Sequence, residues 1–267
     1  MKFLFWNTHK NKDINYLLSE MILENDVSFI ALAEYVANQD ELRTILSEHG
    51  KLIVPYMNAG CNRITLLGNI NNVIPGTQTD YASIQIINKR DIICSIHLPS
   101  KLYDQDGQKK NIIITEIIEN IQNAENDLNT RNTIIVGDFN INPYDPSCVD
   151  APLFHGIPVY TETQRNSRVI SGKEFNMFYN PMWNFLGDFS KPYGTYYYSG
   201  NDPNNTFWNI YDQVLIRPTL RKRFVDNSLR IITQIQSTSL LNKNGHPNKK
   251  ISDHLPIIFE ILEDYYE

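Results

Sequence analysis

The stretch from Asn132 to Asn142 constrains the fold of this chain most. Its uncharged β-branched run, Ile134-Ile135-Val136, is followed at once by Gly-Asp-Phe-Asn. Such a run indicates a strand that is buried on both faces, inside a sheet or a sandwich of sheets. Asp138 and Asn140 lie two residues apart, so in extended backbone their side chains point to the same side. The sequence therefore predicts a carboxylate and a carboxamide at the end of a buried strand, where they could hold a divalent cation or a phosphate oxygen.

Other predicted strands also end in, or just before, a polar residue. Taken alone, Gly-Asp-Phe-Asn could be an ordinary turn, because Gly, Asp and Asn are the common turn residues. The further polar strand ends are Asn7, Glu34, His97, Asp212 and the pair Asp253 and His254. If these ends converge, their carboxylates repel one another unless a cation lies among them. Hard oxygen ligands with few imidazoles favour Mg²⁺ or Mn²⁺ over zinc.

The order of apolar runs predicts many strands with a few helices between them. Strands are expected over residues 2–6, 27–33, 51–54, 63–67, 81–87, 91–98, 134–136, 207–216, 229–235 and 257–262. Helical periodicity marks a segment with Asp13 as its N-cap, a short helix over 40–48, and an amphipathic helix that follows a loop at 104–107 and ends near Leu128. Two packed sheets with helices outside them are the simplest architecture for this pattern.

The region from Asn142 to Asn209 has weak periodicity and is dense in Pro, Asn, Gly and aromatic residues. It is too long for an ordinary connection, so we expect it to form a functional surface rather than a linker. The chain has no internal repeat and no low-complexity tract. We therefore expect a single domain over residues 1–267.

Composition limits the class of protein and its location. The formal net charge of −6 gives no strongly basic domain of the kind found in a dedicated DNA-binding module. The three cysteines are widely spaced and form no Cys-x-x-Cys pair, which argues against a disulfide framework or a structural zinc site. The apolar run at the N-terminus is too short for a signal peptide, and no stretch has the length of a membrane span. A cytoplasmic protein without an obligate protein partner is the expectation.

In its order of motifs, the chain resembles the endonuclease/exonuclease/phosphatase superfamily, which includes pancreatic deoxyribonuclease, abasic-site endonucleases, inositol-polyphosphate 5-phosphatases and neutral sphingomyelinases. The motifs are Phe5-Trp6-Asn7, a Glu after the second strand, Ser95-Ile96-His97, Gly137-Asp138-Phe139-Asn140, Tyr211-Asp212-Gln213-Val214 and Ser252-Asp253-His254-Leu255-Pro256. The resemblance covers nearly the whole chain. It implies a four-layer α/β-sandwich of the deoxyribonuclease type, in which two mixed β-sheets pack face to face with helices outside.

The resemblance also implies a divalent metal ion, Mg²⁺ or Mn²⁺, and assigns ligands to it. Glu34 corresponds to the principal metal-binding carboxylate of the family, with Asn7 beside it. Asp253 corresponds to a second carboxylate on the metal side. A lone Glu or Asn at a strand end is more often solvated or part of a turn, so the assignment depends on these residues meeting in space.

The same resemblance assigns catalytic roles to five residues. Asp138 and Asn140 would hold the nucleophilic water and the phosphate oxygens. His254 is similar to the imidazole that acts as general base or bonds the scissile phosphate, and Asp212 would orient it. His97 matches the strand-end histidine of the deoxyribonuclease-like members, an acid or phosphate ligand, where abasic-site endonucleases carry Tyr.

These assignments predict a metal-dependent phosphoesterase that hydrolyses phosphodiester bonds, with a nuclease acting on DNA or RNA as the first choice. The rival enzyme is a phosphatase or phosphodiesterase acting on a small or lipid phosphate, such as an inositol phosphate, a nucleotide or a sphingolipid. The rival from another class is a catalytically silent binding module with the same fold. The intact set of acids and imidazoles argues against that rival.

The remaining polar and aromatic features have simpler interpretations. The other histidines, His9, His49, His155 and His246, are expected on the surface or in loops. The basic runs Arg221-Lys222-Arg223 and Lys249-Lys250 are interpreted as solvated charge. The aromatic run from Tyr196 to Tyr198 is expected to pack in a strand, and the alternative for it is a stacking platform for bases.

Overall fold

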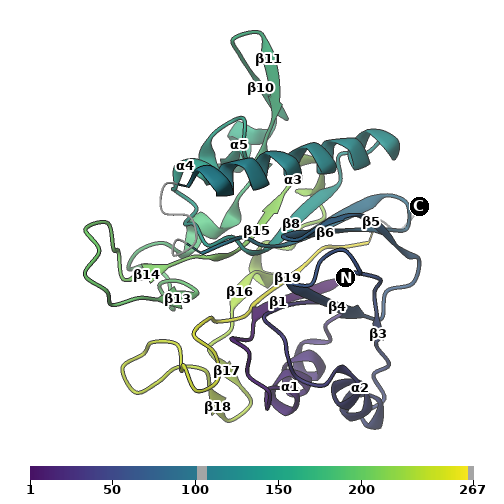
Figure 1. Ribbon diagram of the computed structural model, residues 1–267, viewed down its shortest axis with the longest axis vertical. Helices are drawn as coiled ribbons and strands as arrows, with labels where there is room; N and C mark the ends of the chain where they lie inside the picture. The colour runs from purple at the N-terminus through teal and green to yellow at the C-terminus, as the bar shows by residue number, and fades with distance from the viewer. Residues whose placement is uncertain (101–106, 264–267) are drawn as a thin grey trace.

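Two large sheets form the middle of the molecule in the computed structural model, which describes residues 1–100 and 107–263 (Figure 1). The first sheet has six strands in the order β16-β19-β1-β2-β4-β3, and the second has seven in the order β5-β6-β7-β8-β15-β12-β9. Both sheets are mixed, because β1 pairs with β2 and β7 pairs with β8 in parallel while most other pairs are antiparallel. Most of the loop expected over 104–107 lies outside the described residues.

The strand bounds are as follows. The first sheet contains β1 (Lys2–Asn7), β2 (Phe29–Ala33), β3 (Val54–Pro55), β4 (Ile64–Gly68), β16 (Arg230–Ile231) and β19 (Ile257–Glu260). The second contains β5 (Val73–Thr79), β6 (Ala82–Ile87), β7 (Asp91–His97), β8 (Thr133–Asp138), β9 (Gly156–Ile157), β12 (Phe178–Tyr179) and β15 (Asp212–Ile216). Three small hairpins are β10 (Ser167–Ile170) with β11 (Lys173–Asn176), β13 (Tyr196–Tyr197) with β14 (Trp208–Asn209), and β17 (Gln234–Ile235) with β18 (Thr238–Ser239).

Helices cover the outer faces of the two sheets, which gives the four layers expected from the sequence (Figure 1). The first sheet is covered by α1 (Asn15–Asn25) and α2 (Gln39–Glu48). On the side of the second sheet lie α3 (Gln108–Asp127), α4 (Pro146–Val149) and α5 (Tyr160–Thr163), and the 3-10 turns are η2 (Pro181–Phe185), η3 (Pro218–Leu220) and η4 (Asp226–Ser228). None of the helices in the described part of the chain has the length and apolar composition of a membrane span. The four-layer α/β-sandwich predicted from the sequence is confirmed.

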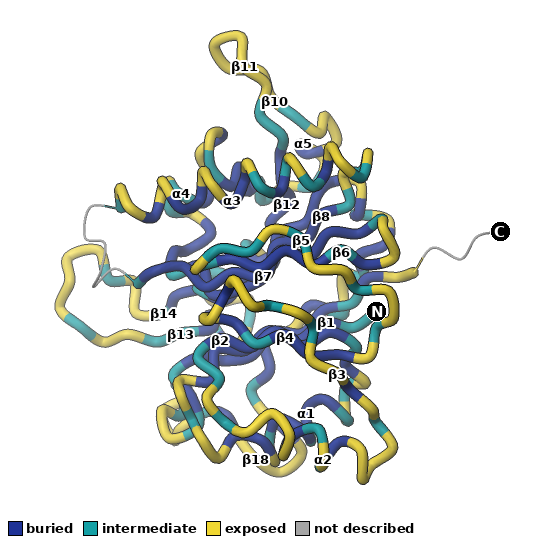
Figure 2. The backbone as a smooth tube through the Cα atoms, turned by 45° about the vertical axis from the view of Figure 1, so that its right-hand side comes forward, coloured by how far each residue is buried: buried dark blue, intermediate teal, exposed yellow. Residues whose placement is uncertain are grey.

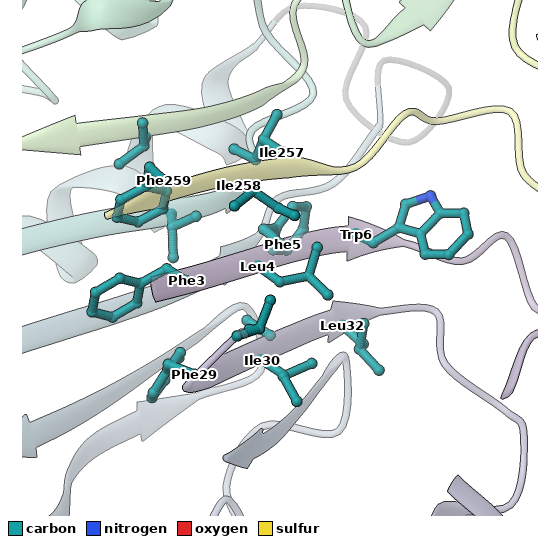
Figure 3. Close-up of a cluster of buried hydrophobic side chains, with 14 of the residues drawn as sticks. Phe3, Leu4, Phe5, Trp6, Phe29, Ile30, Leu32, Ile257, Ile258 and Phe259 are labelled. Carbon is teal, nitrogen blue, oxygen red and sulfur yellow. The ribbon is translucent and has the colours of Figure 1, made fainter. Parts of the chain in front are cut away.

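The strand β8 is buried on both faces, as its β-branched run predicts. Ile134 and Val136 belong to the core between the two sheets, whereas Ile135 belongs to the core under α3. This follows from the pleat, because successive side chains of a strand point to opposite faces. Within the first core, the rings of Phe3 and Phe259 stack at 4.9 Å between centroids (Figure 3).

Helix α3 presents an apolar face to the second sheet and ties itself to that sheet with a buried ion pair. Its isoleucines at helical spacing are buried against β7 and β8, as the periodicity predicts. Near its C-terminus, Glu125 accepts hydrogen bonds from Arg217 at 2.8 and 3.2 Å and from the hydroxyl of Thr133 at 2.6 Å. Because both charges are paired, their burial is tolerated.

Several local predictions are wrong. Asp13 does not cap α1; Ile14 is the N-cap residue and makes no side-chain cap hydrogen bond. The expected strand over 229–235 is split into β16 and β17, and only Val54 of the expected strand over 51–54 belongs to β3. The strand β5 was not expected, because it contains Pro75 and Gly76 and has no apolar run; none of its residues is fully buried (Figure 2). All three cysteines are free and buried, in line with the absence of a disulfide framework.

Gly137 allows β7 and β8 to approach closely just before their ends. A Cβ atom at this position would lie 1.9 Å from the carbonyl oxygen of Ile96, which is its register partner on β7. The neighbouring atom is backbone and cannot move without shifting the strand. Glycine is therefore required for the pairing that leads into His97 and Asp138.

Replacing Gly137 by Ala is expected to lower the free energy of unfolding by about 1–3 kcal/mol or more, as other overpacking changes do. Gly172→Ala is the control, because Gly172 has φ +81° but no atom within 4 Å of an added Cβ, so its cost is conformational, about 1 kcal/mol. Urea denaturation of both variants measures the difference. Equal losses of stability would contradict the close approach described here.

Candidate active site

Three of the predicted site residues form a row across adjacent strands of the second sheet. His97 is the register partner of Asp138 in the parallel pair β7–β8, and Asp138 is the partner of Asp212 in the antiparallel pair β8–β15. Partners directly opposite one another have Cβ atoms about 4.5–5.5 Å apart. The three strands thus bring an imidazole and two carboxylates together at one end of the sheet.

Asp138 lies in the middle of this row and is buried. Its Oδ2 accepts a hydrogen bond from Asn7 Nδ2 at 3.0 Å, and its Oδ1 accepts one from the backbone N–H of Asn140 at 2.9 Å. The same Oδ2 lies 3.6 Å from Nε2 of His97 and 3.9 Å from Nε2 of His254. Asn7 comes from β1, so this contact joins the strand ends of the two sheets.

Asp212 and His254 form a buried hydrogen-bonded pair. Nδ1 of His254 lies 2.8 Å from Asp212 Oδ2, which leaves Nε2 of the imidazole directed toward Asp138. Burial alone would lower the pKa of His254, but the carboxylates of Asp212 and Asp138 outweigh it and raise the pKa to about 10. Burial raises the pKa of Asp212, and the positive charge of His254 opposes that shift. Without a cation nearby, the geometry favours an imidazolium at neutral pH.

Several contacts fix the position of His254. Its backbone N–H donates to Ser252 Oγ at 3.0 Å, the Ser252 hydroxyl donates to the carbonyl of Asn7 at 2.7 Å, and the indole N–H of Trp6 donates to the carbonyl of His254 at 3.0 Å. The ring of Tyr196 packs against the imidazole at 4.8 Å between centroids. The Ser-Asp-His motif is therefore attached to the end of β1 and covered by an aromatic ring.

Glu34 reaches the same cluster from the end of β2. Its Oε1 lies 4.0 Å from Nε2 of His97. The residue has φ +51°, in the left-handed region, and its carbonyl accepts hydrogen bonds from the hydroxyl of Thr8 at 3.0 Å and from the N–H of Lys10 at 3.1 Å. Since a non-glycine residue with positive φ is uncommon, this anchoring indicates a backbone held in place for its side chain.

Asp253 is directed toward His9 instead of Asp138. Its Oδ1 lies 3.0 Å from Nδ1 of His9, a half-exposed residue of the loop after β1. The backbone of His9 donates to Asn7 Oδ1 at 3.1 Å, so this loop also adjoins the cluster. Asp253 is therefore near Asn7 through His9, and its predicted role as a metal ligand stays a prediction.

Asn140, the second polar residue of Gly-Asp-Phe-Asn, is held by its neighbours. Its φ is +50°, its Nδ2 donates to the carbonyl of Leu98 at 3.0 Å, and its own carbonyl accepts a hydrogen bond at 2.9 Å from Nζ of Lys110, a buried residue of α3. Lys110 was not recognised in the sequence, because its place follows from the packing of α3 and from no local pattern.

Thr195 is a second site residue that no local sequence pattern marks. It is buried, and its hydroxyl oxygen accepts hydrogen bonds from the N–H groups of Tyr211 and Asp212 at 3.2 and 3.1 Å. It also hydrogen-bonds through its carbonyl to the N–H of Leu255 at 2.8 Å, next to His254. Thr195 thus joins the two segments that carry the Asp212–His254 pair.

The histidines expected on the surface or in loops behave differently from one another. His49 is exposed, and His155 lies in a loop, where it is fully buried. Burial lowers the pKa of His155. His246 lies in a loop, where its ring stacks on that of Tyr197 at 3.5 Å between centroids.

The donor atoms at the cluster fit a divalent cation that prefers oxygen ligands. One ligand atom from each of Asp138, Asp212 and His254 lies within 4.8 Å of the others, and all three residues are buried. Asp212 Oδ1 is a buried atom without a hydrogen-bond partner in the described part of the chain. Because Nδ1 of His254 is already bonded to Asp212, we interpret these three as an acid–base pair next to a carboxylate and not as a closed ligand set. Carboxylate and amide oxygens are the donors that Mg²⁺ and Mn²⁺ take.

Comparisons with known proteins show similarity of structure without close similarity of sequence. No family model and no curated protein matches the chain. Among solved structures, an endonuclease/exonuclease/phosphatase family protein from Leptotrichia buccalis is 15% identical with a TM-score of 0.57, and the match covers 98% of this chain and 100% of that one. An AP endonuclease from Archaeoglobus fulgidus is 13% identical with a TM-score of 0.55, covering 98% and 99%. A 3' phosphatase, NExo, from Neisseria bound to product DNA hairpin is 13% identical with a TM-score of 0.55, covering 99% and 100%.

These likenesses extend over almost the full length of each chain. The protein has the fold of the endonuclease/exonuclease/phosphatase superfamily, as the resemblance in the sequence implied. At this level of identity the likeness shows the fold alone, and the chemistry depends on the side chains of the site.

The raised pKa of His254 predicts a pH dependence of stability for the metal-free protein. The folded pKa of about 10 lies above the ordinary value of 6.5, so the stabilisation is fully present below the ordinary value and is lost as pH rises through the folded value. We expect the free energy of unfolding to fall from neutral pH toward a pH of about 10, and to fall less in Asp212→Asn.

Denaturation series in EDTA, together with an NMR titration of the His254 ring assigned with His254→Gln, measure both effects. A wild-type imidazole that titrates near 6.5 would show that the carboxylates do not act on it as described.

Proposed function

We propose that this protein is a divalent-metal-dependent phosphoesterase that hydrolyses phosphodiester bonds, and that it acts as a nuclease. The observation that carries the proposal is the meeting of Asp138, Asp212 and His254 at one point, with His97 and Glu34 beside them. Two acids, two imidazoles and a strand-end glutamate match what phosphate ester hydrolysis requires. The fold neighbours described as an AP endonuclease and a 3' phosphatase support the same class of reaction.

In this proposal the metal ion, Mg²⁺ or Mn²⁺, would be held by Glu34 and Asn7, with Asp253 as a second carboxylate on the metal side. When bound, such an ion supplies Lewis acidity and neutralises charge that develops on the phosphate. Glu34 suits this role because its carboxylate lies at the edge of the buried cluster and is partly exposed. Asn7 suits it because its amide already adjoins Asp138 and the loop that carries His9.

The protein side chains position the water, transfer its proton and bind the phosphate oxygens. Asp138, fixed by Asn7 and the N–H of Asn140, holds the attacking water and accepts its proton as the new P–O bond forms. Asn140 and His97 donate hydrogen bonds to the phosphate oxygens. The P–O bond to the leaving group breaks as the leaving oxygen takes up a proton from solvent, and the proton on Asp138 returns to solvent.

His254 has two possible roles, and its surroundings favour one of them. An imidazolium held by Asp212 cannot accept a proton, but its Nε2–H can donate to a phosphate oxygen or protonate the leaving group. With a pKa raised to about 10 by Asp212 and Asp138, His254 serves in this proposal as donor to the phosphate. A cation bound beside Asp138 would lower that pKa and make the general-base role accessible.

A second candidate function is the removal of a terminal phosphate. It is favoured by the fold neighbour from Neisseria, which is described as a 3' phosphatase bound to product DNA hairpin. An inositol phosphate, a nucleotide or a sphingolipid would be the substrate in the small-molecule version. The same side chains could carry out either reaction, so the two functions are distinguished by which substrate the protein hydrolyses. In all cases we propose that residues 1–267 act as one domain, because strands from both ends of the chain, β1 and β19, pair in one sheet.

Removal of a central site residue is expected to abolish turnover without unfolding the protein. We expect Glu34→Ala and His254→Ala each to lower kcat for bis-p-nitrophenyl phosphate, with Mg²⁺ or Mn²⁺ present, by at least about a hundredfold. The exposed residues Glu24 and His49 provide the matched controls Glu24→Ala and His49→Ala. A mild effect of the site variants would mean that the chemistry occurs elsewhere.

Removal of the metal is a separate test. EDTA is expected to stop hydrolysis by the wild-type protein, and added Mg²⁺ or Mn²⁺ to restore it. Activity that resists EDTA would refute the metal mechanism. A panel of DNA, RNA, inositol phosphates and nucleotides then selects the substrate, and inactivity on all of them would favour a silent binding module.

A further inference from the structure

Two loops that adjoin the site carry an excess of lysine. Residues 8–13 follow β1, and residues 242–250 precede Ser252. Together they contain five lysines and a single carboxylate, Asp13, in a chain whose formal net charge is −6. We call the four lysines nearest the site, Lys10, Lys12, Lys249 and Lys250, the lysine ridge.

Hydrogen bonds hold the two loops together and beside the candidate active site. Nδ2 of Asn11, which lies between Lys10 and Lys12, donates to the carbonyl of Ile251 at 3.0 Å, next to Lys250. The N–H of Lys10 donates to the carbonyl of Glu34 at 3.1 Å. The two halves of the ridge therefore adjoin each other although they are some 240 residues apart in the chain.

The ridge lysines are exposed and carry charge that no nearby carboxylate neutralises. Within residues 1–100 and 107–263, the ion pairs do not include Lys10, Lys12, Lys249 or Lys250. Of the neighbouring acids, Asp253 pairs with His9 and Glu34 faces His97, which leaves Asp13 as the one loop carboxylate against four lysines. Four unneutralised ammonium groups on one rim attract a polyanion, and their number matches several phosphates, not one.

The same loop joins the ridge to exposed aromatic side chains. His246 stacks on Tyr197, which binds the 242–250 loop to the β13–β14 hairpin, and Figure 1 shows both segments on the same side of the molecule. Across that hairpin the N–H of Tyr198 donates to the carbonyl of Phe207 at 2.8 Å, and these rings are 42% and 53% exposed. Phe207 has φ +64°, a rare conformation for a bulky residue. Exposed rings on a hairpin that packs against a lysine-bearing loop are a combination suited to hold the bases and backbone of a nucleic-acid strand.

We propose that the lysine ridge binds the sugar–phosphate backbone of a nucleic-acid strand whose scissile phosphate lies at Asp138 and His254. The proposal rests on the proposed phosphodiesterase function and names its substrate class as a polynucleotide that extends over several phosphates. A small phosphate ester would fill the cluster of acids and imidazoles and leave the ridge without a partner. In this proposal the basic run Lys249-Lys250, which was expected from the sequence to be solvated charge, binds the phosphates of the strand.

The test compares a long and a short substrate in matched variants. Two double variants each remove two ridge charges: Lys10→Gln/Lys12→Gln and Lys249→Gln/Lys250→Gln. The control is Lys89→Gln/Lys222→Gln, which removes two exposed charges near the ends of β7 and β15 that lie away from the site. We expect each ridge variant to lower kcat/KM by about tenfold on DNA or RNA of about 30 nucleotides at low salt, and to make its dependence on KCl shallower by about one unit of slope or more. The control should match the wild type. Hydrolysis of bis-p-nitrophenyl phosphate, which carries a single phosphate and no further backbone, should be unchanged in all variants.

Each outcome separates the ridge from the proposed function. Ridge variants that match the control on the oligonucleotides, while both substrates are cleaved, overturn the ridge and leave the phosphodiesterase intact. A wild-type protein that cleaves bis-p-nitrophenyl phosphate but no oligonucleotide overturns the nucleic-acid assignment. Loss of binding to phosphatidylserine vesicles in the ridge variants, with oligonucleotide cleavage unchanged, would show that the ridge binds an anionic lipid surface instead. Inactivity of the wild type on every substrate refutes the proposed function itself.

Discussion

The pairing of β7, β8 and β15 is the constraint on which the rest of the structure depends. Its register sets His97, Asp138 and Asp212 side by side at one edge of the second sheet. A slip of one residue in either pair would turn one of these side chains to the opposite face. The register is held by side chains on both faces of β8, where Val136 packs between the sheets and Ile135 packs under α3. The hydrophobic cores thus fix the positions of the polar groups.

The second constraint is electrostatic. Asp138 and Asp212 are buried carboxylates on neighbouring strands, and carboxylates in that position are costly unless positive charge or hydrogen-bond donors surround them. The molecule provides Asn7, the N–H of Asn140 and the imidazole of His254. The pKa of His254 is raised because the same two carboxylates stabilise the positively charged form of its ring. A bound metal ion would likewise offset the charge of these carboxylates.

Much of the fold and of the cluster could be predicted from the sequence because the relevant patterns are local. The β-branched run at Ile134 marks a strand buried on both faces, and the structure has that strand. The parallel pairs place the ends of β1 and β2, and of β7 and β8, at the same edges, so polar strand ends converge as expected. The features that could not be predicted from the sequence are those that tertiary contacts determine. The strand β5 has no apolar run, and Lys110 and Thr195 act through partners far away in the chain.

Metal binding at Glu34 and phosphate binding beside Asp138 and His254 are tested most directly by a crystal structure of the protein soaked with Mn²⁺ and a nucleotide. The metal is located by its anomalous scattering. We expect a metal peak about 2.1 Å from a carboxylate oxygen of Glu34, with the nucleotide phosphate in contact with His254 and Asn140. A metal peak away from Glu34, or a nucleotide phosphate bound far from Asp138, would contradict this expectation.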